Sequence, residues 1–418
     1  MTRDPHQGAA PNGRIALNFC GFAENTPSIL RKNAENKASN HRNLMATENR
    51  TYIWQLSEWP QWRYDIGALA TPLTEVAMAQ GKLFGALSQL GLAVRERMEV
   101  DALTSDVLKT SAIEGEHFPP QSVRSSVARR LGVDAGAVVA ADRNAEGVVD
   151  MVLDATDRCT EPLSEQRLFA WHAALFPTGY SGLQRIQPGE WRKDEQGPMQ
   201  VVSGRIGREK VHFEAPAADQ LTREMAQFVD WANTDCNHHP MIKAGLAHLW
   251  FVTLHPFDDG NGRVARAVGD LFLARADASP QRYYSLAGQI QREREAYYQI
   301  LEQTQQGGMD VTAWLQWFLR SVHLAVEHAL AGVGISQQRN AYWSRFAHVA
   351  LNARQQKALN RLFEDFEGKL TARKWAAITK TSADTALRDI TALVDAGMLV
   401  RASAGGRSSA YEIPAEFR

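Results

Sequence analysis

The feature that most constrains the fold is a long run of helical periodicity in the second half of the chain. Between residues 164 and 330, apolar side chains recur at three- and four-residue spacing, which is typical of amphipathic helices. β-favouring stretches are scarce there. Two short runs, MQVV and KVHF, lie in a glycine- and proline-rich insert and predict a β-hairpin. The sequence therefore predicts a mainly α fold with one hairpin.

The same periodicity places the individual helices. They are expected over residues 72–91, 95–113, 119–132, 142–158, 164–176, 219–232, 241–254, 263–275, 288–304 and 310–332. Pro72 is expected to open the first of them, because proline is tolerated in the first helical turn. Gly115 is a natural C-cap for the second.

Composition changes along the chain suggest its domains. Residues 1–50 are rich in Asn, Ser, Gly and Arg without sustained periodicity, so we expect them to be disordered or to precede the native start. Dense aromatics in YIWQLSEWPQWRYD then predict a plug that docks onto the core. We expect an N-terminal helical region at 51–160, a helical core at 161–335 and a C-terminal domain at 345–418.

The C-terminal domain is expected to contain three short helices and then two strands around a Gly-Gly turn. That order is typical of a winged helix-turn-helix. However, the candidate recognition helix, residues 382–397, carries three aspartates against the single Arg388, which suits a phosphate-lined groove poorly. A protein–protein or dimerisation role and DNA binding both stay open for this winged-helix-like domain.

Composition also excludes several classes of protein. Lys and Arg number 46 and Asp and Glu 47, so the formal net charge of −1 argues against a surface that wraps nucleic acid throughout. A hydrophobic content of 44% argues against wholesale disorder. No apolar run of about 18 residues would span a membrane, and the N-terminus lacks the apolar core of a signal peptide. We therefore expect a cytoplasmic protein.

A polar, glycine-rich loop is the strongest candidate for a chemical site. It reads HPFDDGNGRVAR, from His255 to Arg266. Glycines on both sides of Asn261, just before a helix, let backbone N–H groups approach an anion. Arg263 and Arg266 lie on one face of the first helical turn. Asp259 offers an oxygen ligand for Mg²⁺, and His255 can transfer a proton near neutral pH. This pattern predicts a polyphosphate site with a general base.

Two other interpretations of this region fit less well. GNGRVA formally matches the dinucleotide fingerprint GxGxxA, but that motif needs a preceding parallel strand, and a helix is expected here. His238, His239, His248 and His255 follow no common zinc spacing.

HPFDDGNGRVAR resembles the signature loop of the Fic (filamentation induced by cAMP) domain, HxFx[DE]GNGRxxR, with every specified position filled. The aromatic segment before residue 65 is similar to the N-terminal extension of one bacterial group of that family. The resemblance thus extends from about residue 51 to 330. It implies a Fic-type helical core with a β-hairpin flap. It also implies adenylylation, the transfer of AMP from ATP to a Ser, Thr or Tyr hydroxyl of a protein.

The resemblance also implies roles for single residues. His255 would take the proton from the attacking hydroxyl, and Asp259 would hold Mg²⁺ against the α- and β-phosphates. The other nucleotide-binding residues implied are Gly260, Asn261 and Gly262 around the phosphates, Arg263 and Arg266 on the β- and γ-phosphates, and Tyr297 and Tyr298 along the pocket.

Two further segments resemble regulatory and target-binding parts of the family. TSAIEG, from Thr110 to Gly115, is similar to the inhibitory motif [ST]xxxE[GN], which implies that Glu114 pairs with Arg266 and keeps it from the γ-phosphate. The hairpin lies where the family has a target-binding flap, to which a target segment adds as a strand. Its candidate contacts are Gln200, Val201 and Val202.

Several alternatives stay open. The same site is compatible with AMP removal or with transfer of another phosphate-containing group, and the chain is also compatible with a DNA-binding regulator whose Fic core is a sensor. Self-modification and a homodimer are further expectations.

Overall fold

The computed structural model describes residues 28–31, 51–134, 142–195, 197–204, 208–234, 237–363, 366, 368–402 and 409–417. The described residues belong to two compact units, Met1–Ala79 with Glu96–Val326 and Gln80–Arg95 with Glu327–Arg418. The larger unit contains most of the predicted N-terminal helical region and most of the predicted core, while residues 80–95 and 327–335 belong to the smaller unit.

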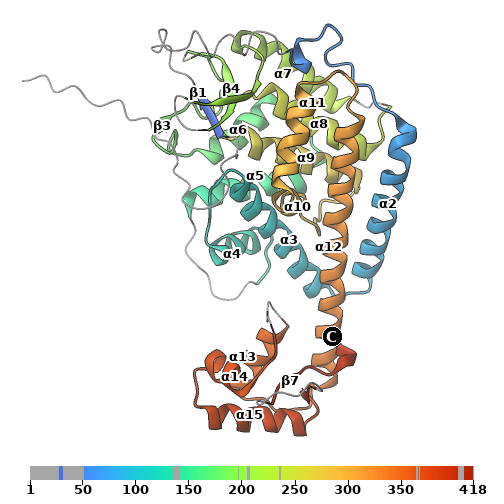
Figure 1. The fold of residues 1–418 in the computed structure, drawn as a ribbon, viewed down its shortest axis with the longest axis vertical. Helices are drawn as coiled ribbons and strands as arrows, with labels where there is room; N and C mark the ends of the chain where they lie inside the picture. The colour runs from blue at the N-terminus through green and yellow to red at the C-terminus, as the bar shows by residue number, and fades with distance from the viewer. Residues whose placement is uncertain are drawn as a thin grey trace, which may run out of the picture. The chain divides into compact units, whose positions relative to one another are not determined.

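Helices dominate the described chain, as predicted (Figure 1). They are α2 (Ile66–Ser88), α3 (Leu92–Ile113), α4 (Pro120–Arg130), α5 (Arg143–Asp157), α6 (Glu165–Leu175), α7 (Ala218–Asn233), α8 (Pro240–Leu254), α9 (Asn261–Ala276), α10 (Leu286–Arg292), α11 (Arg294–Gln305) and α12 (Thr312–Arg345). Short 3₁₀ turns cover Ile53–Gln55 and Ala415–Phe417. Side-chain caps begin several helices; Ser164, for example, accepts a hydrogen bond from Arg167 N at the start of α6.

Helix α8 forms the centre of the larger unit. Apart from Pro240 and Lys243 its residues are all buried, as expected for a helix that is apolar on every side. Helix α12 packs against it at Gly245, where a Cβ atom would lie 2.9 Å from the Leu315 side chain. Trp314 Nε1 donates to Gly245 O over 2.9 Å at the same contact. The close approach fixes α8, and therefore fixes the loop that follows it.

The predicted hairpin is confirmed. Strands β4 (Met199–Ser203) and β5 (Lys210–Glu214) pair antiparallel, with an irregularity between Val201 and Val202. Strand β1 (Ser28–Arg31) pairs antiparallel with the other edge of β4 (Figure 1). The sequence analysis, which expects no fold in residues 1–50, does not predict this strand. Four residues are too few to show the alternation of apolar and polar side chains that marks a strand. The rest of that segment lies outside the described residues.

A second strand pair, β2 (Tyr180–Ser181) and β3 (Gln184–Arg185), was not predicted either, since each strand has two residues.

The N-terminal aromatic plug is confirmed. The Trp59 and Trp62 rings lie 6.0 and 5.7 Å from that of Trp250 on α8. Trp54 Nε1 donates to Glu214 O over 2.8 Å, which ties the plug to β5. These edge-on contacts attach the N-terminal region to the core.

Three helix boundaries differ from the prediction. Helix α2 begins at Ile66, with Pro72 inside it, because Asp65 accepts from Gly67 N and caps the chain earlier. The helix expected at 288–304 is instead α10 and α11, separated where Glu293 leaves helical geometry. Helix α12 continues to Arg345 because Tyr342 is buried in the apolar cluster of the smaller unit.

The smaller unit has the predicted element order. Helices α13 (Ala353–Leu362), α14 (Ala372–Thr379) and α15 (Ala383–Asp395) are followed by the antiparallel strands β6 (Val400–Arg401) and β7 (Tyr411–Glu412). The Gly-Gly turn lies outside the described residues, and the winged-helix assignment stays a prediction. On α15, the expected recognition helix, Asp389 is buried and bound by Arg354 Nε at 2.9 Å. One of the three aspartates is therefore already neutralised within the domain.

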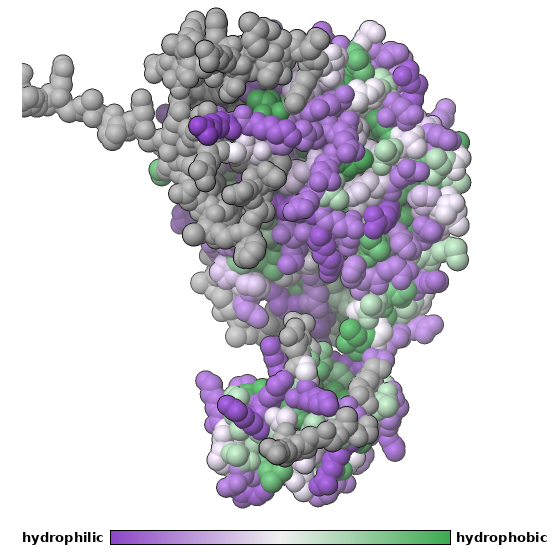
Figure 2. All heavy atoms as spheres, in the orientation of Figure 1, coloured by the Kyte–Doolittle hydropathy of each residue, from purple (hydrophilic) through white to green (hydrophobic). Residues whose placement is uncertain are grey.

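No helix in the described ranges is long and apolar enough to cross a membrane. On the face of the larger unit drawn in Figure 2, hydrophilic side chains predominate among the described residues, while apolar side chains gather inside.

Candidate active site

His255 ends helix α8 in a left-handed conformation, with φ 49° and ψ 53°. Its Nδ1 lies 2.9 Å from Val252 O, and because a carbonyl only accepts, Nδ1 carries the proton. Nε2 therefore bears the lone pair, and it has no hydrogen-bond partner among the described residues. Burial lowers the pKa of His255 to about 4, so the imidazole is neutral at pH 7. A buried neutral imidazole with a free lone pair suits a general base.

Asn261 holds the loop after His255 in shape. Its Nδ2 donates to Phe257 O over 2.8 Å, and its Oδ1 accepts from Phe257 N at 2.9 Å. The Phe257 ring stacks on His172 with centroids 4.0 Å apart. Both ends of the Asn261 amide are thus bound within the loop. In this geometry the predicted phosphate-binding residue shapes the site through Phe257.

The two glycines of the loop are required by close contacts. Gly260 has φ 76°, and a Cβ there would lie 2.9 Å from the Phe176 ring. A Cβ at Gly262 would lie only 2.1 Å from Glu114 Oε1. Gly262 is in the first turn of α9, where unpaired N–H groups and the helix dipole favour an anion. The Glu114 carboxylate lies at that helix N-terminus.

Arg266 is bound by the predicted inhibitory segment. Its guanidinium is 2% exposed, and its Nη2 donates to Glu114 Oε1 over 2.7 Å. Thr110 accepts two more hydrogen bonds, from Nε to Oγ1 at 2.6 Å and from Nη2 to the carbonyl at 2.9 Å. Gly115 has φ 86° and caps α3, as predicted. The geometry brings Thr110, Glu114 and Arg266 together.

Arg263 is bound by a residue that the sequence did not single out. Its Nη1 lies 2.6 Å from Glu116 Oε2, and its side chain is 4% exposed. The Phe176 ring lies beneath the guanidinium, 5.0 Å away. The sequence feature that could have indicated Glu116 is its position as a second carboxylate, two residues after Glu114.

Asp259 faces the same loop. Its Oδ2 accepts from Ser181 Oγ on β2, and its Oδ1 accepts from Gly260 N at 2.6 Å. Within the described ranges, no three His, Cys, Asp or Glu side chains gather into a metal site. Mg²⁺ commonly takes one or two carboxylates together with substrate phosphates, so a lone Asp259 fits it only in the presence of a nucleotide.

Arg192, which the sequence analysis did not single out, holds the backbone of His255. Its side chain is fully buried, and its Nε donates to His255 O over 2.8 Å. Its guanidinium also contacts Pro216 O and Asp194, and its backbone N donates to Pro256 O at 2.9 Å. Arg192 therefore links the His255 backbone to the segment that follows β5.

The two predicted tyrosines differ in exposure. Tyr297 is 1% exposed, and its hydroxyl lies 2.9 Å from His248 Nε2, so both side chains belong to the core. Tyr298 is half-buried, and Arg294 lies over its ring at 5.8 Å. Burial raises the pKa of Tyr298 to about 12, with a further contribution from Glu114. Tyr298 is therefore the better placed of the pair to meet a nucleotide.

The flap candidates lie on β4. Val202 is 2% exposed, and Gln200 Nε2 donates to Glu214 Oε2 over 2.7 Å. The backbone edge of Gln200, Val201 and Val202 that would receive a target strand is paired with β1.

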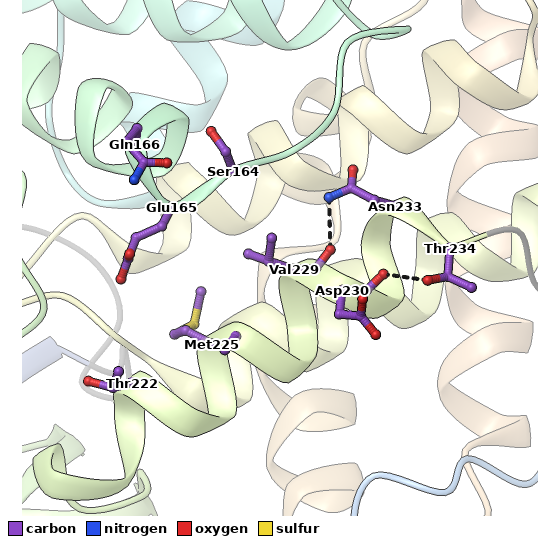
Figure 3. A pocket seen from close by; sticks show the side chains of 10 residues that line it. Ser164, Glu165, Gln166, Thr222, Met225, Val229, Asp230, Asn233 and Thr234 are labelled. Atoms are coloured by element: carbon purple, nitrogen blue, oxygen red, sulfur yellow. Dashed lines mark hydrogen bonds between the residues drawn. The ribbon is translucent and has the colours of Figure 1, made fainter.

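A separate groove of about 620 Å³ lies between the start of α6 and helix α7 (Figure 3). Its lining residues are Ser164, Glu165, Gln166, Thr222, Met225, Ala226, Val229, Asp230, Asn233 and Thr234. None of them is a predicted site residue.

The loop thus defines the class of site: a buried neutral imidazole, six residues before a helix that carries two arginines in its first two turns. Residues 162–273 match the Fic/DOC family model, and residues 52–133 match a model described as a domain of unknown function, DUF4172. The chain is a Fic-domain protein.

Curated relatives carry the name protein adenylyltransferase Fic. The relative from Nematostella vectensis is 32% identical over 124 residues, which are 29% of this chain and 27% of that protein. The relative from Drosophila mojavensis is 25% identical over 227 residues, covering 53% of this chain and 40% of that protein. The chain therefore spans less than half the length of these relatives.

Solved structures of Fic proteins are also similar. A Fic family protein from Desulfovibrio desulfuricans is 21% identical and covers 83% of this chain and 96% of its own, with a TM-score of 0.47. Fic-1 from Caenorhabditis elegans is 17% identical and covers 65% and 74%, with a TM-score of 0.43.

Proposed function

We propose that this protein is an adenylyltransferase that moves AMP from ATP to a hydroxyl side chain of a target protein. The observation that carries the proposal is the buried Nε2 of His255, which has no hydrogen-bond partner among the described residues and lies six residues before Asn261, the first residue of α9. The names of the curated relatives support the same chemistry.

The reaction follows from these positions. The target hydroxyl gives its proton to His255 Nε2 while its oxygen attacks the α-phosphorus of ATP. A new oxygen–phosphorus bond forms, the bond from the α-phosphorus to the bridging oxygen breaks, and diphosphate leaves. Arg263, Arg266 and the N–H groups at the start of α9 stabilise the negative charge on the phosphates.

Asp259 would hold Mg²⁺ at this site together with the nucleotide. When bound, the ion supplies positive charge beside the phosphates. Ser181 Oγ and Gly260 N, which both donate to Asp259, orient its carboxylate.

Autoinhibition by Glu114 is part of the proposal. The Glu114 carboxylate lies where Gly262 leaves room at the helix N-terminus, and it binds Arg266. A phosphate and a carboxylate cannot occupy the same anion site. ATP therefore has to displace Glu114 before Arg266 contacts the γ-phosphate.

Target docking is proposed at β4, with a protein segment in extended conformation as the partner. Because β1 pairs with that edge of β4, an incoming strand would have to replace residues 28–31.

The test is transfer of radiolabel from ATP to protein in the presence of Mg²⁺. Label at the α-phosphate should appear on protein, and label at the γ-phosphate should not. His255→Ala should abolish transfer, whereas His348→Ala, a matched change in the smaller unit, should leave it unchanged. Transfer from the γ-phosphate would refute AMP transfer.

A further inference from the structure

Glu116 lies next to Arg263, the first arginine of the loop, just as Glu114 lies next to Arg266, the second. Its Oε2 lies 2.6 Å from Arg263 Nη1, and Glu114 Oε1 lies 2.7 Å from Arg266 Nη2. Each arginine that would bind phosphate is therefore paired with one carboxylate. We propose that Glu116 is a second control residue of the nucleotide site, which withholds Arg263 as Glu114 withholds Arg266. This inference rests on the proposed use of a nucleoside triphosphate.

Arg263 needs an anionic partner. Its side chain is 4% exposed, and its Nε has no hydrogen-bond partner among the described residues. A charge that is buried without a counter-charge is costly, so an anion should always accompany this guanidinium. Glu116 supplies that anion here, and a nucleotide phosphate would supply it in a complex. The two therefore compete for the same donor.

The carboxylates are also close enough to influence one another. Burial raises the pKa of Glu116, Arg263 lowers it, and Asp259 and Glu114 raise it further. Three carboxylates thus surround the site that we assign to a polyphosphate. Removing the charge of Glu116 reduces the repulsion of an incoming phosphate and weakens the contact that holds Arg263.

Both control residues belong to one short segment. Gly115, in the left-handed region, separates Glu114 from Glu116 at the end of α3. Their partners, Arg263 and Arg266, lie three residues apart on α9 and on the same face. A shift of this one turn would therefore release both arginines together. Replacing Glu114 alone would still leave Arg263 paired.

The two contacts should differ in strength. The Glu116 side chain is 43% exposed, whereas that of Glu114 is 23% exposed. Solvent weakens ion pairs at half-exposed positions. We therefore expect about a 3- to 10-fold gain in ATP affinity from Glu116→Gln, less than the gain from Glu114→Gln.

The experiment measures the Kd of ATP with Mg²⁺ by calorimetry in the full chain with His255→Ala, which prevents turnover. Glu116→Gln should lower this Kd, and Glu116→Asp, one methylene shorter, should lower it less. Glu114→Gln with Glu116→Gln should bind more tightly than Glu114→Gln alone. The control, Glu75→Gln at an exposed position on α2, should leave the Kd unchanged.

The outcomes separate this inference from the function on which it rests. Tighter binding with Glu114→Gln but an unchanged or higher Kd with Glu116→Gln would overturn the role of Glu116 alone. No ATP binding in any variant would overturn both. A thermal melt of each variant shows whether it is folded. If Glu116→Gln does not fold, Glu116→Asp, which keeps a carboxylate, tests the same contact.

Discussion

Replacing Glu114 by glycine should increase the proposed AMP transfer, and the size of the effect follows from the contact of Glu114 with Arg266. The hydrogen bond is 2.7 Å long, the arginine is 2% exposed and the glutamate 23% exposed. Hydrogen bonds to charged groups contribute about 1.5–3 kcal/mol. Partial exposure of Glu114 favours the lower half of that range, about 2 kcal/mol, which corresponds to about a 30-fold gain.

The assay is the initial rate of label transfer from α-labelled ATP at a concentration below the KM. Glu114→Gln should give a smaller gain, because the amide still fills the space above Gly262 and still accepts from Arg266. Thr110 continues to orient the arginine in both variants. An unchanged rate in Glu114→Gly, with the protein folded and ATP bound, would refute the argument that Glu114 withholds Arg266.

Two further predictions concern the same loop. Gly262→Ala should lower transfer even in the Glu114→Gly variant, because the added Cβ would lie 2.1 Å from the present position of Glu114 Oε1, where a phosphate is expected. Full activity of this double variant would place the phosphate elsewhere. Transfer by Glu114→Gly should be constant down to about pH 5 and then fall, because protonation removes the Nε2 lone pair of His255, whose pKa burial lowers to about 4. A midpoint near about 6.5, the ordinary imidazole value, would contradict the buried base.

Local signals were enough to predict much of the fold. Amphipathic spacing located most helices, and MQVV and KVHF located the hairpin. The predicted helix boundaries were wrong where long-range contacts determine them. Pro72 looked like a helix start, yet Asp65 caps α2 earlier. The last turns of α12 form because Tyr342 packs into the smaller unit, and no local pattern reports that contact.

The site shows the same division. The loop from His255 to Arg266 and the segment from Thr110 to Gly115 were found because their residues are contiguous. Arg192 and Ser181 were missed, because their contacts with His255 and Asp259 join residues more than sixty positions apart. The two hydrogen bonds between the Asn261 amide and the Phe257 backbone were also missed, because only the folded loop brings these groups together, and the phosphate contact of Asn261 stays a prediction.

The central claim is that His255 activates a hydroxyl for attack on ATP. The most direct measurement is mass spectrometry of protein incubated with ATP and Mg²⁺, comparing Glu114→Gly with Glu114→Gly plus His255→Ala. We predict an adenylyl group on a Ser, Thr or Tyr side chain in the first sample and none in the second. An adenylyl group that persists without His255, or a transferred terminal phosphate in its place, would contradict this account.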